Sequence, residues 1–179
     1  MREEQWTGAF EPEVTDYIAM LAELVASTAR SDEIFQQLLQ HARTSPALTA
    51  RLVAAAQFLR GDGAIDAEVA FALIATFVDE AHHALAEADS EFKAVDARID
   101  AIERAHGLGE DEFWHVWEGP PEWTAANAEW DRLFAAVPVK FLTRHGEPEM
   151  AQLLGTNEVE FRRREDEGWG RIWGDEFED

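Results

Sequence analysis

One run of apolar residues between positions 66 and 106 constrains the fold more than any other feature of the chain. Its members recur every three or four residues without interruption: Phe71, Ile74, Val78, Ala81, Leu85, Ala88, Phe92, Val95, Ile99 and Ile102. This seven-residue repeat is the pattern that holds a helix against a partner along its whole length. Asp66 is a suitable N-cap, and Gly107 is a suitable glycine for the C-terminal end. The sequence therefore predicts one central helix of about 40 residues over 66–106, roughly 60 Å long at 1.5 Å per residue.

The two halves of this predicted helix differ in the residues that flank the apolar seam. In the first half the flanking positions are also apolar, which is typical of a helix inside a bundle. From Glu87 onward the flanks are charged, and only a narrow apolar stripe remains over 92–102. We expect a later helix of the same chain to cover this stripe, either over residues 123–137 or around Phe161. A homodimer formed through the 92–102 seam is the alternative.

The rest of the chain also predicts helices. Three short amphipathic segments precede the long one and end at Gly61-Asp62-Gly63, so residues 12–106 are expected to form a bundle. Residues 107–167 are expected to form a tryptophan-rich helical extension, because six of the seven tryptophans follow position 107. Residues 168–179 contain glycines between aromatic residues and are expected to form an irregular acidic-aromatic tail. No strand pattern is visible, so the sequence predicts a single all-α domain over 1–179.

The net charge of −22 is the strongest feature of the composition. Residues 61–179 carry 10 basic and 29 acidic side chains, against 5 and 8 in residues 1–60. A field of this sign repels phosphates, so we expect no direct binding of nucleic acid. It suits a basic protein surface, including one that normally holds nucleic acid. Salt adaptation is the alternative explanation, and the two lysines against 13 arginines fit it as well.

Several function classes lack their sequence signatures here. The absence of cysteine excludes disulfides, thiolate metal sites and cysteine nucleophiles. Glycine-rich phosphate loops, a GxSxG elbow and an HExxH motif are also missing. The chain contains no uninterrupted run of about 18 apolar residues, so the sequence predicts no membrane span. The first ten residues have no apolar core of the signal-peptide type. These observations favour a cytoplasmic, non-enzymatic protein without a cofactor.

A metalloprotein is the alternative to a binding protein, and it belongs to a different functional class. Glu-x-x-His occurs at 80/83, 103/106 and 112/115, and on a helix this spacing places both groups on one face. Only Glu80 and His83 continue a second apolar face, formed with Val69 and Leu73. A ferritin-like di-iron protein built on this pair is therefore the alternative, although solvent-exposed charges explain the spacing more simply.

Aromatic side chains in the C-terminal part are the candidate partner-binding residues. Tryptophan is enriched at binding hot spots, and the candidates are Trp114, Trp117, Trp169, Ile172, Trp173 and Phe177. The last four either fold back onto the bundle or dock into a partner. Together with the charge, they favour an accessory, adaptor or inhibitory subunit that engages a basic protein surface. A nucleic-acid mimic is the narrowest form of this hypothesis.

Overall fold

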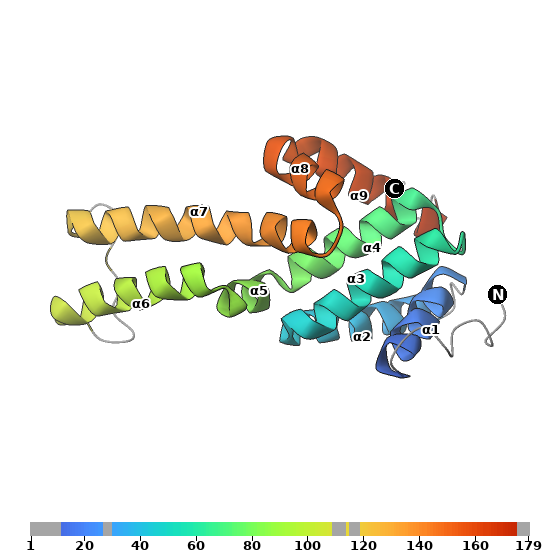
Figure 1. Cartoon of the computed structure of the whole chain (residues 1–179), viewed down its shortest axis with the longest axis horizontal. Coiled ribbons are helices and arrows are strands. Elements are labelled where there is room, and N and C mark those ends of the chain that lie inside the picture. Colours follow the sequence, from blue (N-terminus) through green and yellow to red (C-terminus); the bar gives the residue numbers. More distant parts are fainter. Residues whose placement is uncertain (1–11, 27–29, 109–113, 115–118, 175–179) are drawn as a thin grey trace.

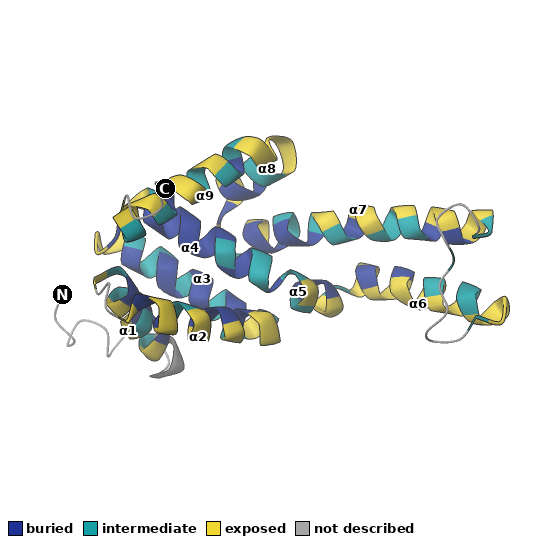
Figure 2. Cartoon of the chain, turned by 180° about the vertical axis from the view of Figure 1, so that it is seen from behind, coloured by how far each residue is buried: buried dark blue, intermediate teal, exposed yellow. Residues whose placement is uncertain are grey.

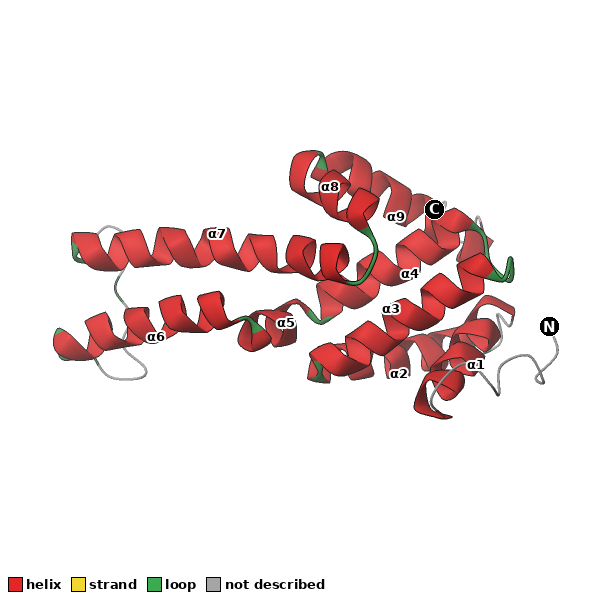
Figure 3. Ribbon diagram, viewed as in Figure 1, coloured by secondary structure: helices red, strands yellow, loops and turns green. Residues whose placement is uncertain are grey.

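The computed structural model describes residues 12–26, 30–108, 114 and 119–174. Its elements are all helices: α1 (Pro12–Ala26), α2 (Ser31–Thr44), α3 (Pro46–Gly61), α4 (Ala67–Glu80), α5 (His82–Ala88), α6 (Ser90–Ala105), α7 (Pro121–Arg144), α8 (Pro148–Thr156) and α9 (Glu158–Trp173). No strand occurs within these residues (Figure 3). The predicted all-α class is confirmed.

Helices α1–α5, α8 and α9 form a compact part of the molecule, here called the body, and α4 lies at its centre. This helix packs against α9 on one side and against α2 and α3 on the other, and α1 lies on α2 and α3 (Figure 1). Nearly every side chain from Val69 to Val78 is buried, and α4 is the most buried helix in Figure 2. Helices α6 and α7 leave this body side by side as a projecting hairpin, here called the arm. The molecule therefore has a compact body and an arm only two helices thick.

The predicted single helix over 66–106 is wrong, because the chain forms three helices there. Helix α4 ends at Glu80, and α5 follows at an angle of 61°. The second break is at Asp89, whose carboxylate accepts hydrogen bonds from the backbone N–H of Glu91 and Phe92 and so begins α6 as its N-cap. Each break is one residue long, so the spacing of three or four residues between apolar positions continues across both breaks. The breaks send the first half of the seam into the body and the second half into the arm.

The same breaks bear on the question of a membrane span. Among the described residues, no single helix is both long enough and apolar enough to cross a membrane. Helices α4 and α5 meet the length and composition requirements only when taken together, and they are bent by 61°. The apolar residues of α4 are buried in the core.

Helix α7 covers the apolar stripe of α6 within the same chain, so residues 123–137, one of the two expected segments, form the cover. The other segment, around Phe161, packs on Phe71 of α4 instead. Phe92 and Val95 are buried. The ring of Phe92 lies 5.0 Å from that of Trp130 and 5.9 Å from that of Phe134. Trp130 and Phe134 are stacked on each other with centroids 4.9 Å apart. The arm is thus held together by an aromatic layer that both helices contribute.

Pro138 lies inside α7 and removes one helical hydrogen bond. Because proline has no N–H, the carbonyl of Phe134 has no donor four residues later. The Nε2 of His82 lies 2.7 Å from this carbonyl oxygen, and the His82 ring is stacked on Phe134 at 3.8 Å. A carbonyl only accepts, so Nε2 of His82 carries the proton and donates it. His82 therefore satisfies the carbonyl that Pro138 leaves free and joins α5 to α7.

We expect His82→Ala to lower the free energy of unfolding by about 1–3 kcal/mol, the cost of an unsatisfied polar group. In a Pro138→Ala background the helix regains its own donor, so His82→Ala should cost less there. Urea unfolding of the two single variants and the double variant measures this coupling. An equal cost of His82→Ala in both backgrounds would contradict the role given to His82.

Helix α9 extends through residues that were expected to be irregular. The prediction of a tail beginning at 168 is wrong over 168–173, because α9 continues to Trp173. Gly168 is buried where α9 crosses α4, and a Cβ atom there would lie 2.6 Å from the Cβ of Ala72 and even closer to the backbone oxygen of Glu68. The glycine is thus required for close packing and does not end the helix. Gly174, with φ of 67°, follows the last helical residue.

Candidate functional site

The predicted partner-binding residues do not gather on one surface. Trp114 lies at the free end of the arm, with its ring 5.2 Å from His106 and 5.5 Å from Trp123. Trp169, Ile172 and Trp173 belong to α9, at the opposite end of the molecule (Figure 1). Trp117 and Phe177 lie outside the described residues. The candidates therefore divide into one group on the arm and one on the body.

The group on α9 is packed against the body. The indole N–H of Trp169 donates to the hydroxyl of Thr76 at 2.9 Å, and its ring meets Phe35 edge-on at 4.7 Å. Trp173 is stacked on Trp169 at 6.1 Å. Of the two alternatives for this segment, folding back onto the bundle describes residues 169–173. Their contribution to partner binding stays a prediction.

An interhelical network fixes α9 on α4. The hydroxyl of Thr76 donates to Glu165 at 2.8 Å, and Glu165 accepts from Arg162, which also pairs with Asp79. Burial raises the pKa of the Glu165 carboxyl, against the opposing effects of Thr76 and Arg162. Arg164 pairs with Glu68 of α4 at 2.7 Å. The arginine cluster of α9 is therefore used largely for contacts with α4.

Pairing inside the chain neutralises most of the described cations. Nine of them form ion pairs with described carboxylates: Arg30, Arg43, Arg60, Arg98, Lys140, Arg162, Arg163, Arg164 and Arg171. Several connect separate helices, as Arg98 of α6 does with Glu129 of α7. In α6 and α7, four other cations are exposed and form no ion pair with a described residue: Lys93, Arg104, Arg132 and Arg144.

Most of the remaining described carboxylates are exposed to solvent. On the arm and at its base, Glu87, Asp96, Asp100 and Asp131 are exposed and form no ion pair with a described residue. On the body the same holds for Asp16, Asp62, Glu149 and Asp166. The arm presents its carboxylates on a narrow projecting element whose outer faces are mostly exposed (Figure 2). This shape lets a partner contact the arm from more than one side.

The free end of the arm combines aromatic rings with carboxylates. The indole N–H of Trp123 donates to Glu103 at 2.9 Å, and His106 Nε2 lies 3.5 Å from Glu122. Trp114 stands nearly perpendicular to both Trp123 and His106, with interplanar angles of 78° and 75°. Rings and carboxylates side by side suit the cationic side chains of a protein partner.

The residues of the metal alternative are not arranged as that alternative requires. Glu80 pairs with Arg43, and the helix is interrupted at Ala81, between Glu80 and His83. His83 is exposed, and the centroid of its ring lies 5.1 Å from that of Phe134. Among the described side chains, no group of three or more histidines and carboxylates is placed to hold a metal ion.

Comparison of the chain with models of protein families, with curated proteins and with solved structures gives no match. Its function is therefore inferred from the contacts, charges and shape of this chain alone.

Proposed function

We propose that this chain is a non-enzymatic helical binding protein that engages a basic surface of a protein partner through its arm. One observation carries the proposal: four exposed carboxylates on the projecting arm and at its base, Glu87, Asp96, Asp100 and Asp131, form no ion pair with a described residue. An accessory, adaptor or inhibitory subunit is the role that this arrangement suits. A partner whose basic surface otherwise holds nucleic acid is the narrower form of the proposal. The cytoplasm is the compartment we propose, on the sequence grounds given above.

The arm is the part of the molecule that best suits contact with a partner. It projects beyond the body, so a partner can approach it without displacing any helix (Figure 1). Its interior is filled by its own aromatic layer, which leaves the outer faces available. At the free end, Trp123 is buried, and the half-buried ring of Trp114 and the exposed ring of His106 add contact area to the attraction between charges.

Two variants with equal changes of charge test the proposal. The arm variant carries Glu87→Gln, Asp96→Asn, Asp100→Asn and Asp131→Asn. The body variant carries Asp16→Asn, Asp62→Asn, Glu149→Gln and Asp166→Asn. Each serves as full-length bait in a lysate of the source organism, beside the unsubstituted chain, and bound proteins are identified by mass spectrometry.

We expect the unsubstituted chain and the body variant to retain the same basic protein at about 50 mM salt, and the arm variant to lose it. About 500 mM salt should release it in every case, because ionic strength screens exposed charges. Equal losses by the two variants would show that only the overall charge matters and would overturn the arm as the binding element.

Circular dichroism of the isolated chain separates this proposal from salt adaptation. If the acidic groups serve a partner, helicity should stay constant from molar to millimolar salt, because the ion pairs and the core hold the fold. A salt-adapted protein would lose helicity as salt is removed, since its unpaired carboxylates would repel one another. Unfolding at low salt would contradict the proposal.

A further inference from the structure

A cavity of about 470 Å³ lies at the base of the arm, where α3, the α5–α6 junction and the second half of α7 meet. This volume is within the range of small-molecule sites in proteins. Alanines of two helices make the space: Ala47 and Ala50 of α3 and Ala88 of α5. Larger side chains at these positions would fill it.

The inner wall of the cavity is apolar. Leu85, Val137 and Phe141 line it, and each is buried in the fold. The ring of His145 lies over Phe141 at 4.2 Å and continues this wall. Apolar groups of a ligand would therefore contact side chains that are already held in place by the core.

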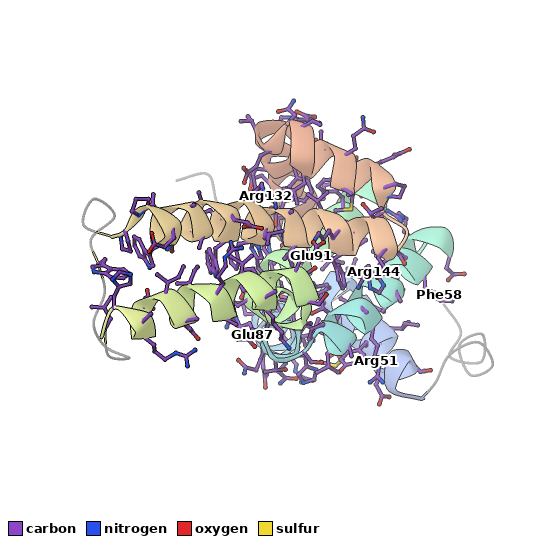
Figure 4. The ribbon with its side chains drawn as sticks, turned by 60° about the vertical axis from the view of Figure 1, so that its left-hand side comes forward. Arg51, Phe58, Glu87, Glu91, Arg132 and Arg144 are labelled. Carbon is purple, nitrogen blue, oxygen red and sulfur yellow. The ribbon has the colours of Figure 1, made fainter. Side chains whose placement is uncertain are left out.

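Among the charged groups around the cavity, one cation has no ion-pair partner in the described residues. Lys140 lies 3.3 Å from Asp89 and 2.5 Å from Glu91, so its single charge is shared by two carboxylates. Burial, with a contribution from Arg144, lowers the pKa of His145 and so favours its neutral imidazole. Arg144 also lines the cavity, is exposed, and forms no ion pair with a described residue. It lies on the side of α7 that faces α3, whereas Arg132 lies on the other side of that helix (Figure 4).

We infer that this cavity binds a small amphipathic anion, a carboxylate carried on an alkyl chain. The carboxylate pairs with the guanidinium of Arg144, whose planar donors match two oxygens at once. The alkyl chain lies on Leu85, Val137 and Phe141. Asp89 also lines the cavity, but its carboxylate already accepts hydrogen bonds from Lys140 and from the backbone N–H groups of Glu91 and Phe92. More distant carboxylates oppose this binding weakly, because their fields are screened beyond about 8 Å at physiological ionic strength.

Calorimetric titration of the full-length chain with decanoate, below its micellar concentration, tests the inference. We expect one site, with decylammonium, of the same chain length and opposite charge, binding at least about tenfold more weakly. Arg144→Gln should weaken decanoate binding by about tenfold or more. Arg132→Gln removes the same charge from the same helix outside this cavity and should leave the affinity within about twofold.

Ala47→Phe tests the apolar part of the site, since Ala47 is exposed and a phenyl ring there would occupy the cavity. We expect this variant to lose decanoate binding while its melting temperature stays close to that of the unsubstituted chain. The inference is overturned if decylammonium binds as tightly as decanoate. It is also overturned if Arg144→Gln and Arg132→Gln behave alike, or if decanoate gives no binding heat.

Discussion

Replacing Gly168 by alanine should lower the free energy of unfolding by about 3 kcal/mol, at the upper end of the usual cost of overpacking. The added methyl group would lie 2.6 Å from the Cβ of Ala72 and still closer to the backbone of Glu68, so α4 and α9 must move apart. Backbone atoms cannot rotate away as a flexible side chain can. Separation would also disturb neighbouring contacts, including the buried pair of rings Phe71 and Phe161, whose centroids are 5.0 Å apart.

Gly170 provides the matched control, because it belongs to the same helix but a methyl group added there would meet no other group within 4 Å. Gly170→Ala should raise stability by about 0.5–1 kcal/mol, since alanine has the higher helix propensity. Urea unfolding of the two variants measures both effects. Stabilisation by Gly168→Ala as well would show that α9 does not pack on α4 at this distance.

Phe92→Ala should lower the free energy of unfolding by about 3 kcal/mol, the usual cost of removing a buried aromatic side chain. Phe92 is 6% exposed and touches Trp130 and Phe134, so its removal leaves a cavity between α6 and α7. Thermal or urea unfolding gives the magnitude, and light scattering of the same samples gives the oligomeric state. The apolar stripe of α6 is covered by α7 of the same chain, so the molecular mass measured in solution should not change.

Val159→Ala is the control for this experiment. Val159 is 82% exposed, so the substitution should alter stability by less than about 0.5 kcal/mol. Should Phe92→Ala instead leave stability intact and convert a dimer to a monomer, the 92–102 seam would be an interface between two chains. The packing of α7 on α6 would then be wrong.

Local sequence determined most of the helices and several of their ends. Asp66 accepts hydrogen bonds from the backbone N–H of Glu68 and Val69, as its position before the apolar run predicts. The spacing of the apolar residues also identified the apolar seam over 66–106. Residues 123–137 were one of the two segments expected to cover the 92–102 stripe, and the segment around Phe161 was the other. These features depend on neighbours within a few residues, which is why the sequence alone contains them.

The breaks at Ala81 and Asp89 were missed because apolar periodicity does not register the insertion of one non-helical residue. A signal was present at the second break: Asp89, followed by Ser90 and Glu91, is a typical helix N-terminus. The apolar seam continues across this cap, so periodicity alone predicts an uninterrupted helix. At Ala81 no such residue marks the bend, and His82, directly after it, contacts Phe134 of α7.

Only the tertiary structure decided the meaning of Gly168, the pairing of the charges and the existence of the cavity. Helix propensity penalises Gly168, and the reason for the glycine is the backbone of α4, about 100 residues earlier in the chain. Arg164 and Glu68 are equally remote in sequence, so composition reports the net charge but not which carboxylates stay free. The cavity requires alanines of α3 and α5 to face Arg144 of α7. Such relations between distant residues arise when helices pack, and no local pattern encodes them.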